Sequence, residues 1–299
     1  MRTEQEIIEL IIKIAEDDDR IRAAYIHGSR VNPGVKKDKY SDYDIVYVVT
    51  EVDSFINNKE WLNCFGNIIF SFEGHKVQNK FFMKDINNLS HRYVWSMLFD
   101  DGLHIDLMIE IVEEGMNHGH IKNKPTIILL DKDNCLPKTK SVNELDYCIQ
   151  KPCKDEFEAC CSGFWWFLNN VAKGIARDQL AYTREEFNTK ILATLNCMIE
   201  WYIGIQSGFS VSTGKDGKNY KKYLPKNIYD LYTKTFFNSD YKSIWNAVFS
   251  TCELFSKTAS NVGDFLNYTY NKQEEKNMMD YLIKIRNTPI ILNGEYINE

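Results

Sequence analysis

The sequence predicts an α+β protein with two domains: a mixed β-sheet with flanking helices over residues 1–150, and an all-helical domain over residues 151–299. In the first half, short runs of β-branched and aromatic residues are interspersed with helical patterns, which is typical of a sheet covered by helices. Beyond residue 154 the apolar residues recur at steps of three and four, the period of an amphipathic helix. With 299 residues the chain is long enough for two separate cores.

Local patterns place the elements of the first domain in order. Thr3 and Glu6 have the spacing of a capping box and precede an apolar stripe, so a helix begins there. Asp100-Asp101-Gly102 separates two apolar runs and is typical of a hairpin turn. Strands are expected at residues 22–27, 42–49, 68–72, 92–99, 104–109 and 126–130, and helices at residues 54–64 and 110–118, with no assignment for the polar stretch that reaches Ser90.

The second domain follows a connection over residues 131–154 that contains Pro137 and Pro152. A long amphipathic helix is expected from residue 155 to residue 178. Further helices are expected at residues 184–206, 229–237, 240–260 and 273–286. The eight cysteines contain no Cys-x-x-Cys pair and indicate reduced thiols, with Cys160-Cys161 in the helical core.

Three acidic residues on expected strands predict a metal site. Asp42 and Asp44 open a β-branched run, and alternate side chains of a strand project to the same face. Asp106 leaves its own strand opposite to its apolar neighbours and would join them. Three carboxylates suit Mg²⁺ and a nucleoside triphosphate. Gly28-Ser29 ends another strand, where glycine permits close approach of a phosphate and serine adds donors, so the pattern predicts nucleotidyl transfer.

The formal net charge of −6 disfavours an enzyme that acts on nucleic acid, because phosphate backbones are held by excess Lys and Arg. An acidic balance suits a cationic small-molecule acceptor. The charged N-terminus and the lack of an apolar run of membrane-spanning length favour a cytoplasmic protein without a membrane partner. The sequence leaves monomer and homodimer open.

The chain resembles the aminoglycoside nucleotidyltransferases of the DNA-polymerase-β-like superfamily, and among them the streptomycin 6-adenylyltransferases. The resemblance covers most of the chain and implies ATP as co-substrate, Mg²⁺, an aminoglycoside hydroxyl as acceptor, and pyrophosphate release. It is carried by blocks in the family's order and spacing: Arg20-Ile21-Arg22, Gly28-Ser29-Arg30, Asp42-Tyr43-Asp44-Ile45-Val46-Tyr47, Trp61-Leu62, Phe65-Gly66-Asn67-Ile68-Ile69, Leu129-Leu130-Asp131-Lys132-Asp133, Lys151-Pro152, Glu156-Phe157, Cys160-Cys161, Phe164-Trp165, Lys173-Gly174 with Arg177, Gly214-Lys215 with Lys218, and Tyr223-Leu224.

Basic residues are the expected nucleotide ligands. The resemblance adds Arg30 to the phosphate-binding pair Gly28-Ser29. Lys215 and Lys218 lie on a Gly-rich turn and can close over phosphates as point charges. Lys173 shares a polar helix face with Arg177, so it either contacts the triphosphate or the substrate rim, or is a solvated surface residue.

Two acidic residues are candidates for the general base. Asp106 is the first candidate, because the resemblance implies an acid at this strand position, and Glu185 is the second. Asp178 and Glu185 are expected to contact the acceptor. They also mark departures from the family: Asp178-Gln179 stands where streptomycin-modifying relatives carry Lys or Arg followed by Glu, and Glu185 replaces an aspartate. The sequence thus predicts the reaction, adenylyl transfer, more firmly than it predicts streptomycin as the acceptor.

Other polar and aromatic residues have structural interpretations of equal weight. His27 and His104 adjoin the predicted site and either steer a phosphate or nucleobase or are structural, while His118 and His120 are expected in an exposed turn. The tryptophans of the helical domain are expected mostly in its core. Two rival functions remain: a nucleotidyltransferase that acts on another small molecule or a protein, and a nucleotide-binding module without catalysis. The long helical half disfavours the first, and the intact acidic set disfavours the second.

Overall fold

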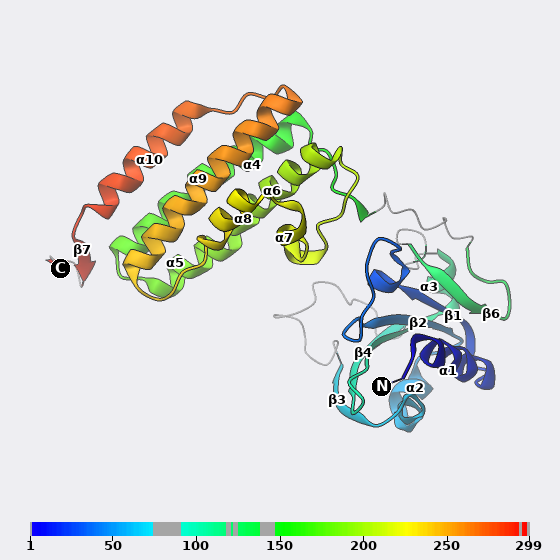
Figure 1. Cartoon of the computed structure of the whole chain (residues 1–299). Coiled ribbons are helices and arrows are strands. Elements are labelled where there is room, and N and C mark those ends of the chain that lie inside the picture. The colour runs from blue at the N-terminus through cyan, green and yellow to red at the C-terminus, as the bar shows by residue number, and fades with distance from the viewer. Residues whose placement is uncertain are drawn as a thin grey trace. The chain divides into compact units, whose positions relative to one another are not determined.

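The computed structural model describes residues 2–73, 91–117, 121, 125–137, 147–292 and 295–297. The chain divides into two compact units, the sheet unit at residues 1–146 and the helical unit at residues 147–299 (Figure 1). Most of the polar stretch that reaches Ser90, together with His118 and His120, lies outside the described residues.

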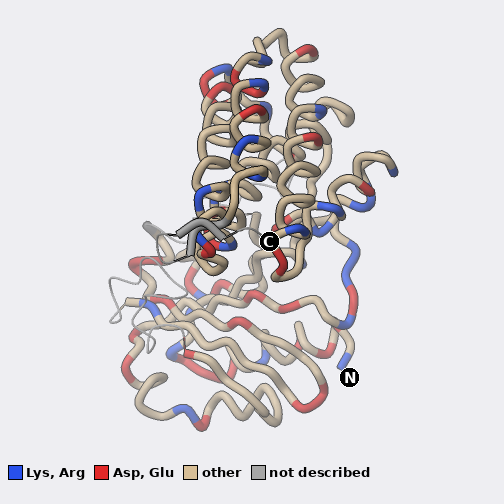
Figure 2. Tube along the Cα trace, turned by 90° about the vertical axis from the view of Figure 1, so that its left-hand side faces the viewer, with Lys and Arg blue, Asp and Glu red and all other residues tan. Residues whose placement is uncertain are grey.

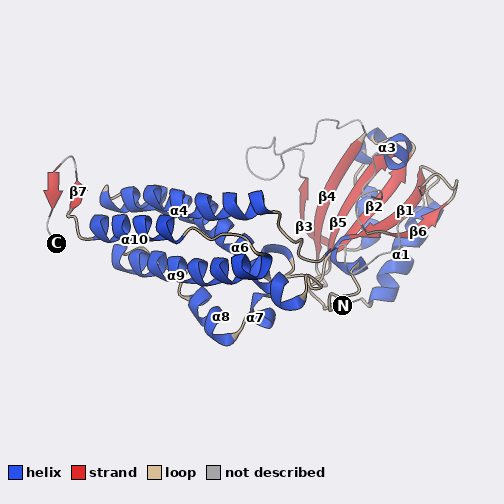
Figure 3. Cartoon of the chain, turned by 90° about the horizontal axis from the view of Figure 1, so that it is seen from above, coloured by secondary structure: helices blue, strands red, loops and turns tan. Residues whose placement is uncertain are grey.

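A six-stranded mixed sheet forms the centre of the first unit (Figure 3). Its order is β3-β4-β5-β2-β1-β6; β2 and β5 run parallel, and the other neighbouring strands run antiparallel. The strands are β1 (Ile21–His27), β2 (Tyr43–Val49), β3 (Ile68–Glu73), β4 (Arg92–Phe99), β5 (His104–Ile111) and β6 (Ile127–Asp131). The parallel pair at the centre matters most, because it sets the register of the acidic residues.

Helices cover the two sheet faces unequally. On one face, α1 (Glu4–Asp17), α2 (Asp53–Asn57) and a 3₁₀ helix at Glu60–Phe65 pack over the larger core, where the hydroxyl of Tyr47 donates to the Ile11 carbonyl at 2.8 Å. The opposite face carries a smaller cluster that includes Tyr25, Val46 and Val48, with α3 (Val112–Asn117) beside it. This second face also carries half-buried polar side chains at the start of β2 and β5.

The helical unit is built around long helices packed side by side, with the rings of Phe164 and Phe255 stacked at 3.7 Å in its core. Cys160 and Cys161 are buried there, as expected. Its elements are α4 (Lys154–Ala176), α5 (Leu180–Glu186), a π-helical turn (Phe187–Ile191), α6 (Leu192–Ser207), a 3₁₀ turn (Lys215–Gly217), α7 (Tyr220–Tyr223), α8 (Lys226–Thr233), α9 (Tyr241–Leu266), α10 (Lys272–Arg286), β7 (Ile290–Leu292) and β8 (Glu295–Ile297).

Three expectations about the elements require correction. The helix expected at residues 54–64 is two short helices, since Asn58 ends the first and its side chain accepts from the Glu60 amide at 3.0 Å. Glu110 belongs to β5 rather than to the following helix, and its side chain is buried. The helical unit also contains the antiparallel pair β7–β8, so it is mostly rather than wholly helical. Within the described residues, no helix is both long and apolar enough to cross a membrane.

Candidate functional site

Strand register brings two of the three predicted acidic residues together on the second face of the sheet. Asp44 of β2 lies directly opposite Asp106 of β5, and His27 of β1 lies opposite Asp44 from the other side. Asp42 directly precedes β2, which begins at Tyr43. The parallel pairing of β2 with β5 thus makes Asp44 and Asp106 neighbours, although they are far apart in the chain.

His104 lies between two of these carboxylates. Its Nδ1 is 2.8 Å from Oδ1 of Asp42, and its Nε2 is 3.4 Å from Oδ1 of Asp106. A neutral imidazole has a single N–H, so it donates to only one of the two at a time. His104 is two residues from Asp106 on the same strand, so alternation alone places both side chains on one face. The imidazole is thus part of the acidic site.

The Asp44 side chain packs directly against the backbone of Gly28. A Cβ at this position would lie 2.0 Å from Oδ2 of Asp44, and the backbone φ of +77° is in the left-handed region. Glycine is the residue that tolerates both conditions. Ser29 and Arg30 follow in a 3₁₀ turn, Gly28–Val31, so the turn that carries the predicted phosphate donors lies against an acidic residue of β2.

The acidic set fits a hard divalent cation in its donor chemistry. Carboxylate oxygens are the ligands that Mg²⁺ prefers. Oδ1 of Asp106 is buried and meets no hydrogen-bond donor at bonding geometry within the described residues, although the Nε2 of His104 faces it at 3.4 Å. No three Asp, Glu, His or Cys side chains of the described ranges are already arranged as a metal site, and binding of an ion to Asp42 and Asp106 together would require His104 to turn aside.

Arg30 is buried next to this set. Its Nε donates to the carbonyl of Asp42 at 2.9 Å, and its Nη2 donates to the carbonyl of Ser41 at 2.6 Å. The guanidinium carbon lies 3.5 Å from the centroid of the Tyr43 ring, and Nη1 lies 3.7 Å from a carboxylate oxygen of Glu4. The side chain predicted to bind phosphate is therefore largely engaged by the protein.

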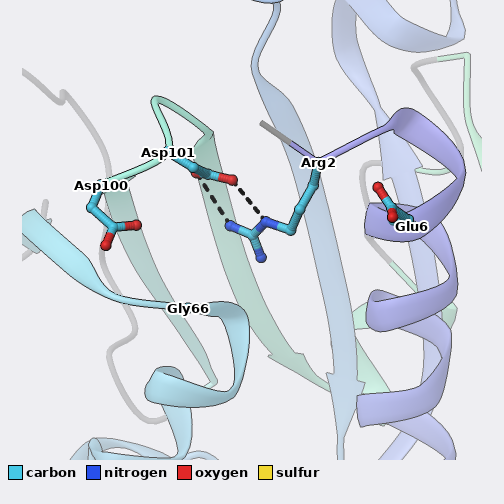
Figure 4. Close-up of a pocket in the computed structure, with 5 residues that line it drawn as sticks. All are labelled: Arg2, Glu6, Gly66, Asp100 and Asp101. Atoms are coloured by element: carbon cyan, nitrogen blue, oxygen red, sulfur yellow. Dashed lines mark hydrogen bonds and ion pairs between the residues drawn. The ribbon is translucent and has the colours of Figure 1, made fainter.

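The sheet unit also contains two cavities, one of which adjoins Arg30. The larger, of about 500 Å³, is lined by Arg2, Glu6, Gly66, Asp100 and Asp101 (Figure 4). Arg2 donates from Nε to Oδ2 of Asp101 at 2.9 Å, and this hydrogen bond lowers the pKa of that carboxyl group. This cavity contains no predicted site residue, and the basic residue of its lining, Arg2, is already paired with Asp101.

The second cavity, of about 290 Å³, adjoins the residues that precede β2. It is lined by Arg2, Glu4, Ile7, Arg30, Lys37, Asp38, Lys39, Ser41, Tyr43 and Leu103. Glu4 is shared between Lys37 and Arg30, at 2.8 Å and 3.7 Å. Both basic groups thus have an acidic partner.

The remaining predicted residues belong to the helical unit, where acidic and basic residues are interspersed along the helices (Figure 2). Lys173 is half-buried on α4, and Glu185 is exposed on α5. Asp178 has a positive φ of 54° and accepts from the hydroxyl of Tyr241 at 2.6 Å. Burial, and then this hydrogen bond, raises the pKa of Tyr241. Trp166 is an exception to the expected tryptophan core, because 68% of it is exposed.

Lys215 and Lys218 are both exposed on a tight turn of the helical unit. Gly214 has a φ of +70° and allows the chain to reverse. A hydrogen bond ties the start of this turn to α6, since the hydroxyl of Thr213 donates to the carboxylate of Glu200 at 3.1 Å. Within the described residues neither lysine has an ion-pair partner, which leaves both available to an anionic ligand.

Known proteins resemble this chain over most of its length. A family model described as streptomycin adenylyltransferase matches residues 1–285. An aminoglycoside 6-adenylyltransferase from Bacillus subtilis (strain 168) is 32% identical over 275 residues, which covers 92% of this chain and 95% of the relative. The enzyme of the same name from Staphylococcus aureus is 31% identical and covers 94% of this chain and 98% of its own. A crystal structure of an aminoglycoside 6-adenyltransferase from Bacillus subtilis is 30% identical, covers 96% of this chain and all of that one, and has a TM-score of 0.47.

Proposed function

The chain belongs to the streptomycin adenylyltransferase family and is a nucleotidyltransferase, and we propose that it transfers AMP from ATP to a hydroxyl of a streptomycin-like aminoglycoside, with Mg²⁺ and with release of pyrophosphate. The observation that carries this proposal is the register of Asp44 opposite Asp106, with Gly28 closed over the Asp44 carboxylate. The relatives that carry the name aminoglycoside 6-adenylyltransferase support the acceptor class.

Asp42, Asp44 and Asp106 would hold Mg²⁺, which when bound neutralises phosphate charge and aligns the reacting groups. Asp106 is the first candidate to receive the proton of the attacking hydroxyl, because its carboxylate lies on β5 directly opposite Asp44 and its Oδ1 accepts no hydrogen bond within the described residues, where the Nε2 of His104 faces it at 3.4 Å. Glu185 is the second candidate, and its exposure on α5 suits contact with a cation at least as well.

Residues near the two glycine turns would bind the phosphates. The Gly28-Ser29 turn supplies backbone amides and a hydroxyl where glycine permits close approach. Lys215 and Lys218, exposed and without acidic partners in the described part of the chain, would stabilise charge on the departing pyrophosphate. Lys173 would contact the triphosphate or the rim of the acceptor site. In this proposal residues 1–150 form the nucleotidyltransferase domain, and residues 151–299 form the domain that clamps nucleotide and substrate.

The acceptor would be held by acidic residues of the helical unit. Asp178 is fixed by the hydroxyl of Tyr241, and Glu185 is exposed close to it in sequence. Carboxylates attract the guanidinium and ammonium groups of an aminoglycoside.

Incubation of the purified full chain with ATP labelled at the α-phosphate, Mg²⁺ and a panel of aminoglycosides tests the proposal. We expect label to appear in streptomycin or a close relative, with a mass increase of one AMP. The variant Asp44→Asn is the control and should give no product. If label enters a protein or an unrelated small molecule while every aminoglycoside remains unmodified, the chain is a nucleotidyltransferase with a different acceptor.

A further inference from the structure

We propose that Arg30 is a positioning residue that holds the backbone of Asp42 in place for metal binding, and so couples the Gly28–Val31 turn to the first acidic residue of the site. This inference rests on the proposed function, since it concerns the same metal-dependent transfer. It assigns Arg30 a role different from the phosphate contact that the family resemblance implies.

Asp42 needs such support because it lies outside the β-ladder. The pairing of β2 with β5 begins at Tyr43 opposite Ile105, and the pairing of β2 with β1 extends only to Asp44 opposite His27. Asp44 is therefore fixed by neighbouring strands on both sides. Asp42 instead ends the loop that follows the Gly28–Val31 turn, and no described strand residue pairs with it.

The guanidinium of Arg30 supplies the missing contacts. It donates to the carbonyls of both Ser41 and Asp42, at 2.6 Å and 2.9 Å. Two hydrogen bonds from one planar group to consecutive carbonyls fix the orientation of the peptide units as well as their distance. The ring of Tyr43 stacks on the same group at 3.5 Å. Three consecutive residues, Ser41, Asp42 and Tyr43, are thereby clamped to the turn that carries Gly28.

The burial of Arg30 indicates that its main role is to bind the carbonyls of Ser41 and Asp42. Only 8% of Arg30 is exposed, so a phosphate would have little access to it. Its remaining nitrogen, Nη1, faces Glu4 at 3.7 Å. A buried guanidinium that binds carbonyls and a carboxylate is satisfied by the protein alone.

The experiment compares Arg30→Met and Arg30→Lys with Arg20→Met. Arg20 is a matched control, because its guanidinium also stacks on an aromatic ring, Phe55 at 4.0 Å, and donates to Ser54 at 2.8 Å, but touches no site residue. Binding of Mn²⁺ is measured by electron paramagnetic resonance in the presence of a non-hydrolysable ATP analogue. The same variants are assayed for kcat and for the KM of ATP at saturating Mg²⁺, and their thermal unfolding is recorded.

We expect Arg30→Met to weaken Mn²⁺ binding by roughly tenfold or more and to lower kcat by roughly 10²-fold, while the KM for ATP at saturating metal changes by less than about threefold. Arg30→Lys should retain part of the metal affinity, because its ammonium group still donates, but its single nitrogen cannot reproduce the planar two-nitrogen contact of the guanidinium. Arg20→Met should leave metal binding and kcat at wild-type values even if its melting temperature falls.

Two results would overturn the assignment. One is loss of ATP affinity in Arg30→Lys with unchanged Mn²⁺ binding, which would make Arg30 a phosphate ligand. The other is an equally large loss of Mn²⁺ binding in Arg20→Met, which would show that the Arg30 variants lose metal affinity through lower stability of the fold. The metal-binding measurement needs no acceptor, so a wild type that binds Mn²⁺ but modifies no aminoglycoside would refute the proposed acceptor and leave the Arg30 test intact. If Arg30→Met does not fold, Arg30→Lys alone decides between the outcomes.

Discussion

The two units of the molecule position their candidate residues in different ways. In the sheet unit, Asp44 and Asp106 are paired by the backbone itself, so their carboxylates share one face at neighbouring strand positions. In the helical unit, Glu185 and Lys215 are exposed side chains, one on a helix surface and one on a turn. Backbone pairing fixes a geometry before any ligand arrives, whereas exposed charges acquire theirs on binding. The first group should therefore control chemistry, and the second should control affinity.

Asp44→Asn tests the first half of this contrast and has the largest expected effect. Loss of one negative ligand should lower kcat by roughly 10³-fold or more, because the metal no longer stabilises the transferring phosphate. Asp42→Asn should behave similarly. The measurement is single-turnover adenylylation at saturating Mg²⁺, with thermal unfolding as the control for folding. Near-normal turnover in either variant would refute the acidic metal set.

Asp106→Asn and Glu185→Gln separate chemistry from binding directly. Asp106→Asn should abolish transfer to every acceptor, on the order of 10³-fold, because it removes both a ligand and the candidate base. Glu185→Gln should mainly weaken binding of the cationic acceptor, and the loss should shrink at high salt as an exposed charge pair is screened. Single-turnover rates and streptomycin affinity at two salt concentrations distinguish the two.

The opposite pattern for Glu185 would reverse the assignment. If Glu185→Gln abolished chemistry but retained salt-sensitive acceptor binding, Glu185 would be the general base. The contrast between paired and exposed residues would then fail at this position.

Gly28→Ala should reduce activity by roughly 10- to 10²-fold, because the added methyl group would displace the Asp44 carboxylate that lies 2.0 Å from its position. Gly208→Ala is the matched control, since Gly208 also has a positive φ, of +61°, but nothing lies within 4 Å of its added Cβ. Backbone strain should cost both variants about 1 kcal/mol of unfolding free energy, and Gly28→Ala should lose more because its Cβ also meets the Asp44 side chain. Activity assays corrected for the folded fraction should show a loss only in Gly28→Ala.

The sequence was most informative where periodicity and register coincide. The strand period predicted the faces of Asp44 and Asp106, which the register of β2 and β5 brings together, whereas Asp42, expected on the same strand, precedes β2. The turn at Asp100-Asp101-Gly102 is confirmed by the pairing of β4 with β5. The β7–β8 hairpin was missed, although Asn293-Gly294 between the strands is a strong hairpin signal in sequence.

Long-range side-chain contacts were beyond the reach of the sequence. The hydrogen bonds of Arg30 to residues 41 and 42 cross a loop whose path no local pattern specifies. The break at Asn58 was missed for a related reason, because an apolar helical pattern does not reveal that a side chain will bond to a nearby amide. Summed residue propensities predict where a helix lies, but a single side-chain hydrogen bond can decide where that helix ends.

Lys215→Ala probes the exposed group and should have a moderate effect. We expect a rise of roughly tenfold in the KM for ATP and a smaller fall in kcat, since a lysine at the outer phosphates contributes to ground state and leaving group alike. Lys221→Ala is the control, because Lys221 is also exposed and lies on the neighbouring helix α7. Calorimetry that showed intact ATP affinity together with lost aminoglycoside affinity would assign the turn to the acceptor instead.

Each unit also contains a carboxyl group whose pKa is raised by burial. Glu110 in the sheet accepts a hydrogen bond from the Tyr25 hydroxyl at 2.7 Å, and Glu200 in the helical unit accepts from Thr213 at 3.1 Å. Glu110 is fully buried, while Glu200 is only partly buried. The sheet unit should therefore show the stronger dependence of stability on pH.

The sign follows from linkage. A carboxyl group with a raised pKa binds its proton more tightly in the folded state, so its contribution is complete below its ordinary value of 4.5 and is lost as the pH rises through the folded value. Relative to Glu110→Gln, the wild type should lose unfolding free energy above pH 4.5 with a slope of at most about 1.4 kcal/mol per pH unit, the limit for one proton. Urea unfolding from pH 4 to pH 7 measures it, and Glu200→Gln should show a smaller difference of the same sign. An equal or larger slope for Glu200 would mean that the Arg92 side chain, 3.3 Å from Glu110, offsets the cost of burying that carboxylate.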